Sequence, residues 1–357
     1  MDATQPRQRR SAAGTSSIAL VVLLLLCASV ALSACGDSGT TSTSPSAVSS
    51  RAAASPSDAA SPSRTPLPTP AGAGTIAFAK VTPTGRGFAT GDIYVVRTDG
   101  TGLTRLAAGT ADECQPAWSA DGRRIAYAAG RPAAGPSSYV LRVMNADGSG
   151  KEILPGVASA GQLPAWSPRG TQLAFYHPPR SKPVLAWKTQ SWDGLVVVNA
   201  YGNGWGGSPT RPATGDRFAA YAPDGRLYFV RRGIGDIFCI YRTMTTRVTT
   251  SGGLGAFSLS PDGTRLVVYD KEHDHLVLRS ASAGGTEAVL VDHVSRYVNA
   301  PMVRPAWSPD GTQIAFAASS VDGHPGGSGL YVIQADGTGF SRVPMKGRVC
   351  DSAWRPQ

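Results

Sequence analysis

Charged residues are scarce in this sequence, and so is the residue mixture that favours long helices. Only 16% of the 357 residues are charged, whereas 42 are glycine and 27 are proline. Glycine and proline destabilise the interior of a helix and are common in turns. The composition therefore argues against a mainly helical protein and favours an all-β fold with many turns.

The short motifs of hydrolases and nucleotide-binding enzymes are also missing. No Gly-x-Ser-x-Gly sequence occurs, and the Gly-Ser-Gly at 327–329 is followed by Leu330. Residues 148–151 resemble a phosphate-binding loop, but Glu152 stands where that loop needs serine or threonine. We therefore predict that the protein is not an enzyme and has no cofactor.

The N-terminus has the pattern of an export signal. Residues 7–10 contain three arginines, and an apolar run extends from Ile18 to Ala34. Residues 32–36 read Leu-Ser-Ala-Cys-Gly, which resembles the lipobox of bacterial lipoproteins. In that family the cysteine is alkylated with diacylglycerol, and the chain is then cut just before it.

We predict a signal peptide at residues 1–34 and lipidation of Cys35, with palmitate-type acyl chains in the bilayer. The alternative is an uncleaved N-terminal membrane helix, and both place the remainder outside the cytoplasm. Residues 35–73 are rich in Ser, Thr, Ala and Pro, with almost no large apolar side chain, which predicts a disordered tether.

Residues 74–357 contain one unit many times over. Its core is Pro-Ala-Trp-Ser-Pro-Asp-Gly-Thr-x-Ile-Ala-Phe, and equivalent positions are 38 to 55 residues apart, which fits one four-stranded propeller blade per unit. The copies lie at 116–127, 164–175, 220–229, 258–268, 305–316 and, truncated, 352–356. Each unit is predicted to form strand A (Pro-Ala-Trp), a Pro-Asp-Gly turn, strand B (Ile-Ala-Phe), strand C, an Asp-Gly-Thr-Gly turn and strand D.

The two ends of this region complement each other. Residues 74–79 match strand B with no strand A before them, whereas Ala353-Trp354 match strand A with no strand B after them. We predict that the C-terminal strand completes the N-terminal blade and closes a six-bladed β-propeller.

The repeat resembles the TolB-type propeller repeat over essentially all of residues 74–357. In that family TolB is a periplasmic partner-binding protein of the cell envelope, and similar blades occur in serine peptidases and sugar lyases. The resemblance implies a scaffold more than any one activity. The chain departs from TolB because a tether stands in place of the N-terminal α/β domain, and because Tyr221 and Leu259 replace the repeat tryptophan.

In such a blade the B–C and D–A connections lie on one face, and the long segments all belong to this set. They are 81–91, 178–192, 208–217, 291–304 and 319–328. Cations and aromatic residues alternate there and suit an acidic peptide or an anionic polymer, although they are also compatible with solvated charges and loop packing. The candidate binding residues are Arg180, Lys182, Trp187, Lys188, Trp192, Arg211, Arg217, Arg296, Tyr297 and Arg304. The repeat tryptophans Trp118, Trp166, Trp307 and Trp354 are predicted to be core.

Cysteine and histidine each give one further candidate. Cys114 and Cys350 occupy equivalent positions in adjacent blades. They could form a disulfide that locks the ring, and the alternative is two free thiols. Cys239 fits a buried strand C. His273 and His275 are weak metal candidates, and a polar loop is the alternative.

The sequence thus predicts an extracytoplasmic, membrane-anchored lipoprotein that acts as a binding or scaffold module for a protein or an envelope polymer. The net charge of +10 fits acidic partners or anionic polymers. We expect a monomer with no nucleic-acid partner. The rival hypothesis is a lyase or hydrolase acting on polyanionic sugar, with a metal near His273 and His275.

Overall fold

The computed structural model describes the repeat region with several gaps. The described residues are 74–83, 89–154, 161–179, 193–201, 205–207, 209, 215–285, 287–294, 303–318 and 327–357. They belong to one compact unit, Leu67–Gln357. The signal peptide, Cys35 and the tether predicted at 35–73 lie outside the described residues. Within the described ranges, no helix combines the length and apolar character needed to cross a membrane.

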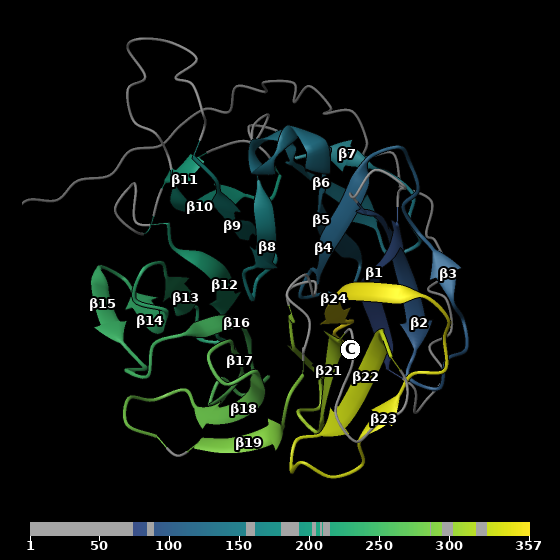
Figure 1. Cartoon of the computed structure of the whole chain (residues 1–357). Helices are drawn as coiled ribbons and strands as arrows, with labels where there is room; N and C mark the ends of the chain where they lie inside the picture. The colour runs from purple at the N-terminus through teal and green to yellow at the C-terminus, as the bar shows by residue number, and fades with distance from the viewer. Residues whose placement is uncertain are drawn as a thin grey trace, which may run out of the picture. The chain divides into compact units, whose positions relative to one another are not determined.

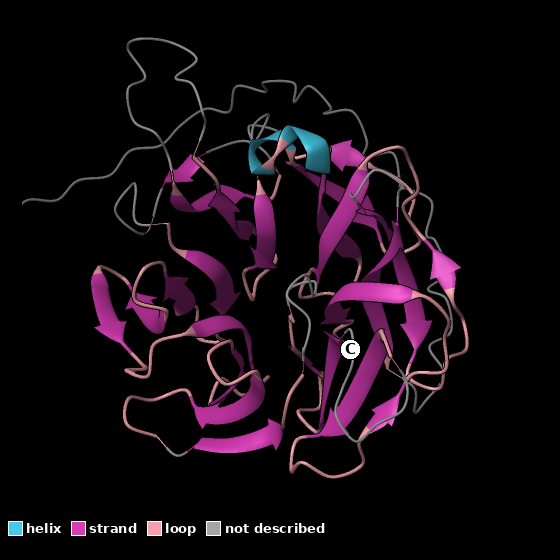
Figure 2. Ribbon diagram, in the orientation of Figure 1, coloured by secondary structure: helices cyan, strands magenta, loops and turns pink. Residues whose placement is uncertain are grey.

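The described strands form six four-stranded antiparallel sheets arranged as blades around a centre (Figures 1 and 2). From the inner to the outer strand, blade 1 consists of β24 (Arg348–Trp354), β1 (Thr75–Pro83), β2 (Ala89–Arg97) and β3 (Thr104–Arg105); blade 2 of β4 (Asp112–Trp118), β5 (Arg124–Gly130), β6 (Val140–Asn145) and β7 (Glu152–Ile153); and blade 3 of β8 (Gln162–Trp166), β9 (Gln172–His177), β10 (Gly194–Asn199) and β11 (Trp205–Gly207). Blade 4 consists of β12 (Arg217–Tyr221), β13 (Leu227–Arg231), β14 (Asp236–Tyr241) and β15 (Met244–Arg247); blade 5 of β16 (Leu254–Leu259), β17 (Arg265–Asp270), β18 (His275–Ser280) and β19 (Glu287–Val291); and blade 6 of β20 (Ala306–Trp307), β21 (Gln313–Ala318), β22 (Gly329–Gln334) and β23 (Ser341–Arg342). Two short 3₁₀ helices, η1 (Pro132–Ala134) and η2 (Pro136–Ser138), connect β5 to β6. The predicted six-bladed propeller is confirmed.

The ring is closed by β24, which pairs antiparallel with β1. Ile76 lies opposite Trp354 and Phe78 opposite Ser352, and the Arg355 N–H donates to the Thr75 carbonyl at 2.8 Å. The C-terminal strand therefore supplies the inner strand of the N-terminal blade, as predicted, and covers an edge of β1 that would otherwise expose unpaired backbone groups.

The repeat tryptophans pack between blades, which confirms that they belong to the core. None of the four is more than 8% exposed. The indole N–H of Trp118 donates to the Ala353 carbonyl at 3.2 Å, and that of Trp166 donates to the Ala117 carbonyl at 3.1 Å. Each of these two bonds crosses to the preceding blade, so one large ring both fills the gap and fixes the register of neighbouring sheets.

The A–B turns obtain their stability from a local carboxylate. The hydroxyl of Ser260 donates to Asp262, and so does the Thr264 N–H at 3.0 Å. These hydrogen bonds lower the pKa of Asp262 to about 2. The same Ser–Asp pair recurs at Ser308 and Asp310 in blade 6, where the hydroxyl donates at 2.6 Å. The Pro-Asp-Gly segments are thus turns, as their sequence predicts.

We call the surface formed by the B–C and D–A connections the loop face. One of its predicted long segments, 81–91, is shorter than expected. Val81 pairs with Gly91 and Pro83 with Ala89, so β1 and β2 continue into this segment and the connection comprises only 84–88. The predicted connection was too long at both ends. Its Thr, Pro and Gly residues are typical of turns, but the backbone hydrogen bonds between β1 and β2 continue through them. Most of the other four segments lies outside the described residues.

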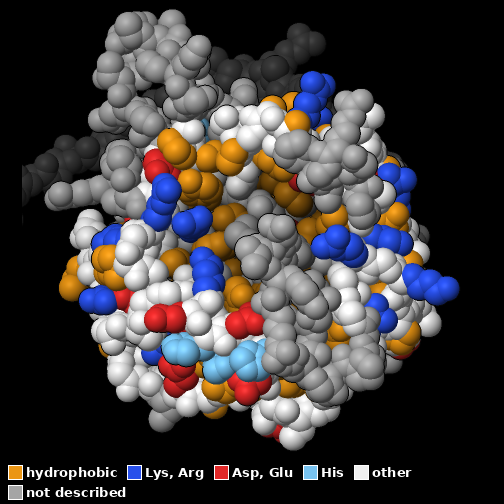
Figure 3. All heavy atoms as spheres, viewed as in Figure 1, with side chains coloured by type: hydrophobic (Ala, Val, Ile, Leu, Met, Phe, Trp, Pro, Cys, Tyr) orange, Lys and Arg blue, Asp and Glu red, His pale blue; other side chains and the backbone are white. Residues whose placement is uncertain are grey.

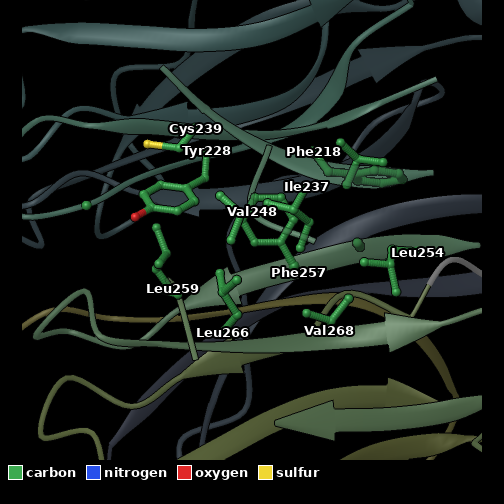
Figure 4. Close-up of a cluster of buried hydrophobic side chains, with 14 of the residues drawn as sticks. Phe218, Tyr228, Ile237, Cys239, Val248, Leu254, Phe257, Leu259, Leu266 and Val268 are labelled. Carbon is green, nitrogen blue, oxygen red and sulfur yellow. The ribbon is translucent and has the colours of Figure 1, made fainter. Parts of the chain in front are cut away.

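The space between blades 4 and 5 is filled by a large apolar cluster (Figure 4). Phe218, Tyr228 and Ile237 from blade 4 face Phe257 and Leu266 from blade 5. Cys239 belongs to this cluster and lies in β14, the third strand of its blade, which confirms its predicted burial. We call this packed boundary between blades 4 and 5 the seam. The candidate site lies where the seam meets the loop face.

The inter-blade tryptophans predict a specific loss of stability. Trp354→Ala should destabilise the fold by about 3–5 kcal/mol, because it empties a buried aromatic site on the closing strand. The control is Tyr241→Ala, which removes a half-exposed ring and should change stability by less than about 0.5 kcal/mol. Chemical denaturation of both variants measures the difference, and equal midpoints would refute the closing role of Trp354.

Candidate functional site

A pocket of about 430 Å³ opens at the loop-face end of the seam between blades 4 and 5. Four cationic side chains line it: Arg217, Arg231, Arg232 and Lys271. In Figure 3 Lys and Arg side chains gather over this part of the ring. The pocket is therefore a strongly basic concave feature of the loop face.

The strands bring these cations together because all four lie at strand ends on one face. Arg217 is the first residue of β12, Arg231 the last of β13, and Lys271 directly follows β17. Arg217 precedes a β-bulge at Phe218, which has a positive φ of 57°. Bulges of this kind redirect side chains at strand ends and are common beside functional sites.

Two glycine turns form one wall of the pocket. Gly235 has a φ of +73°, and a Cβ at this position would lie 2.7 Å from the backbone nitrogen of Gly253 in the next blade. Only glycine combines this backbone conformation with so close an approach. The turns of blades 4 and 5 therefore meet here without a side chain between them.

Two of the four cations are neutralised by carboxylates. The Arg231 Nε lies 3.3 Å from Oδ1 of the fully buried Asp216, and the Arg232 Nη1 lies 3.1 Å from Asp193 Oδ2. The Arg231 guanidinium also lies over the Phe238 ring, 4.3 Å from its centroid. These two arginines are thus held in place by the protein's own charges.

Arg217 and Lys271 differ from that pair, since neither forms an ion pair with a carboxylate among the described residues. Their charged groups lie on the same aromatic ring, at 5.8 Å and 5.7 Å from the Phe218 centroid. Burial lowers the pKa of Lys271, and the neighbouring Arg217 lowers it further. Two like charges that form no ion pair among the described residues favour the binding of an anion, although the Glu272 carboxylate also lines the pocket.

Three histidines lie side by side on the loop face of blade 5. The His273 and His275 ring centroids are 5.7 Å apart, and those of His275 and His293 are 5.9 Å apart. Figure 3 shows His side chains with Asp and Glu beside them in this part of the ring. His273 Nδ1 lies 2.8 Å from Asp270 and His275 Nε2 lies 2.7 Å from Asp292. Within the described ranges, no three His, Cys, Asp or Glu side chains are arranged to hold a metal ion.

Arg304 has a different environment from Arg217. Its Nη1 lies 3.9 Å from Oδ1 of the buried Asp351, whose pKa is raised by burial. Asp351 also accepts from the Gln115 N–H at 3.2 Å, and the Gln115 side chain accepts from the Leu163 N–H at 2.8 Å. Arg304 thus takes part in a polar chain along the inner strands of blades 6, 1, 2 and 3.

The predicted binding residues are only partly described. Arg217 lines the pocket and Arg304 contacts the inner strands. The others lie outside the described residues: Arg180, Lys182, Trp187, Lys188, Trp192, Arg211, Arg296 and Tyr297. Sequence reasoning missed Arg231, Arg232 and Lys271 because it considered only long connections. Their signal is a cation directly after a strand B pattern, as in Leu-Tyr-Phe-Val-Arg-Arg at 227–232.

The two candidate disulfide cysteines are free thiols in the structure. Cys114 lies in β4 and Cys350 in β24, which are the inner strands of adjacent blades, and both belong to one buried cluster. Burial raises the pKa of both thiols.

Solved structures with a similar fold include two TolB proteins. TolB from Acinetobacter baumannii has a TM-score of 0.60 and 19% identity, with 80% of this chain and 67% of that chain covered. A putative TolB from Agrobacterium tumefaciens has a TM-score of 0.53 and 15% identity, with 76% and 88% covered. The chain therefore has the TolB-like six-bladed propeller fold.

Kuenenia stuttgartiensis hydrazine synthase is also similar, with a TM-score of 0.57, 13% identity and 79% of this chain but 47% of that chain covered. At such identities the similarity concerns the fold alone. No protein-family model matches the sequence, and no curated protein sequence is significantly similar to it.

The disulfide stays a prediction for the oxidised protein. A bridge would close a loop of more than two hundred residues and should stabilise the ring. Alkylation in denaturant without reductant should then label Cys239 but neither Cys114 nor Cys350, and reduction should expose both. Labelling of all three cysteines before reduction would show that the bridge does not form.

The pKa of His273 should lie measurably above that of an ordinary histidine side chain. The hydrogen bond to Asp270 raises the pKa of His273 and, reciprocally, lowers that of Asp270. The pair should therefore stabilise the loop between about pH 4 and 6.5, and this contribution should disappear as pH rises through the raised His273 pKa or falls through the lowered Asp270 pKa.

An NMR titration of the ring resonances tests this expectation. Asp270→Asn should move the His273 midpoint downward, whereas Asp292→Asn should leave it in place. A midpoint that does not respond to Asp270→Asn would show that the hydrogen bond has no effect on the charge of the ring.

Proposed function

We propose that this protein is a membrane-anchored, extracytoplasmic lipoprotein that acts as a binding or scaffold module for a protein or an envelope polymer. The lipobox-like sequence around Cys35 supports the anchor. The TolB-like propeller supports a scaffold role, since TolB proteins are envelope proteins of the same fold.

One observation carries the binding role. Arg217 and Lys271 come from two blades and lie at the same Phe218 ring, and neither forms an ion pair with a carboxylate among the described residues. Arg231 and Arg232 in the same lining are neutralised. Arg217 is half-buried and Lys271 is exposed, so both charged groups remain accessible to a ligand that enters the pocket. Their arrangement favours a negatively charged partner.

The wider charge of the chain is consistent with this role. Cleavage before Cys35 removes three arginines and one aspartate and leaves a net charge of about +8, which attracts anionic partners over about a Debye length and accelerates their association. The pocket then supplies the short-range contacts. The rival sugar lyase or hydrolase has no specific observation in its favour in the described part of the chain.

A double substitution tests the proposal. Arg217→Ala with Lys271→Ala should lower the capture of partners from envelope fractions by at least about tenfold, because hydrogen bonds to charged groups contribute roughly 1.5–3 kcal/mol each. The melting temperature should not fall, since neither side chain has an ion-pair partner among the described residues.

Lys346→Ala provides the matched control. Lys346 is an exposed cation in the D–A connection between blades 6 and 1, so its loss changes the charge of the same face without touching the pocket. Capture that is equally weak in control and double variant, or undiminished in the double variant, would contradict the assignment of binding to this pocket.

A further inference from the structure

The pocket between blades 4 and 5 also indicates the chemical class of its ligand. We propose that it binds a phosphomonoester group, held jointly by the Arg217 guanidinium and the Lys271 ammonium. This inference rests on the proposed binding function and names the group that this site recognises.

The local charge balance is the first argument. Asp216 neutralises Arg231 and Asp193 neutralises Arg232, one carboxylate for each cation. Arg217 and Lys271 form no ion pair among the described residues, and their charged groups lie at the same aromatic ring, with the exposed Glu272 carboxylate elsewhere in the pocket lining. A phosphomonoester carries about −1.5 to −2 at pH 7, so it can pair with both cations and still outweigh the repulsion from Glu272.

The geometry of the two cations is the second argument. Arginine presents a planar fork of donors and lysine a compact point charge, and proteins use both on phosphate oxygens. Here one comes from the start of β12 and the other from the end of β17, on opposite sides of the seam. A tetrahedral group with several oxygens can accept from both sides at once, and a flat carboxylate does so less well.

The remaining lining restricts what the phosphate is attached to. Val230, Ile234 and Leu254 form an apolar side of the pocket, and Ile234 is 46% exposed. Val230 and Leu254 are already buried, so an aromatic or aliphatic group esterified to the phosphate would mainly cover Ile234, gaining roughly 25 cal/mol per Å² of apolar area removed from water. Glu272 also lines the pocket and repels a second anionic group. The site therefore suits one phosphoryl group on an apolar body better than a dense polyanion.

Binding should depend on pH at both ends of the range. Burial and Arg217 lower the pKa of Lys271, and a bound phosphate would raise it again by favouring the ammonium. Affinity should therefore decrease as pH rises through the Lys271 pKa. It should also decrease below about pH 6, where the phosphomonoester loses its second charge.

Isothermal titration of the full-length protein in detergent tests the inference, with phenyl phosphate, inorganic phosphate and benzoate as probes. Phenyl phosphate should bind with one-to-one stoichiometry, more tightly than inorganic phosphate and at least tenfold more tightly than benzoate. Arg217→Gln and Lys271→Gln should each weaken it about tenfold or more. Lys346→Gln should remain within about twofold of the native protein, and so should Arg123→Gln, which changes an exposed cation in the turn between β4 and β5, away from the loop face. Equal affinity for benzoate, or unchanged affinity in the two pocket variants, would overturn the proposal.

Competition separates this inference from the proposed function. If pocket variants lose partner capture but phenyl phosphate neither binds nor competes, the phosphate inference is wrong and the binding function stands. If phenyl phosphate binds through Arg217 and Lys271 but the variants capture partners normally, the inference stands and the proposed function at this pocket is wrong. Phosphatase treatment of the envelope fraction shows whether the captured partner carries the phosphate. Loss of capture after treatment supports a phosphomonoester on a macromolecule. Capture that is unchanged by phosphatase, yet still displaced by free phenyl phosphate, would contradict a phosphomonoester on the partner.

Discussion

The pairing of β24 with β1 is the constraint on which the other features of this propeller depend. A blade needs four strands to bury its faces, and the N-terminal blade has only three from its own end of the chain. The closing strand also links its neighbours: the Ser352 hydroxyl donates to the Arg304 carbonyl at 2.9 Å, while Asp351 accepts from Gln115. One strand thus connects blades 6, 1 and 2. Its loss would leave blades 6 and 2 without these contacts to blade 1.

The candidate site depends on the same closure, although it lies elsewhere in the ring. Its cations come from two blades, so their separation is set by the angle between neighbouring sheets and not by any single loop. The apolar cluster beside the pocket fixes that angle, and Phe218 and Leu254 lie at its right-hand end in Figure 4. The packed blades thus hold the Arg217 and Lys271 side chains at one ring, that of Phe218.

The sequence predicts the fold well because most blades repeat the same local chemistry. The tryptophan predicts core packing, the Pro-Asp-Gly segment a turn and the unmatched strands at the two ends a pairing, and all three are present in the structure. Site prediction was less successful. Arg217 was identified because it lies beside a long connection, whereas Arg231 and Lys271 lie at the start of short ones. Their proximity arises from packing between blades, which periodicity within one repeat cannot show. The segment 81–91 was misassigned for a related reason, since its ladder depends on pairing with the opposite strand rather than on local propensity.

Native-state hydrogen exchange of β1 tests the closure most directly. In the full-length chain, the amides of Ile76–Val81 should exchange only through global unfolding, because β1 is paired on both sides. In a chain that ends at residue 347, the same amides should exchange much faster, with those that pair with β24 affected first. Protection of β1 that persists undiminished after removal of β24 would contradict the account of a ring closed by its last strand.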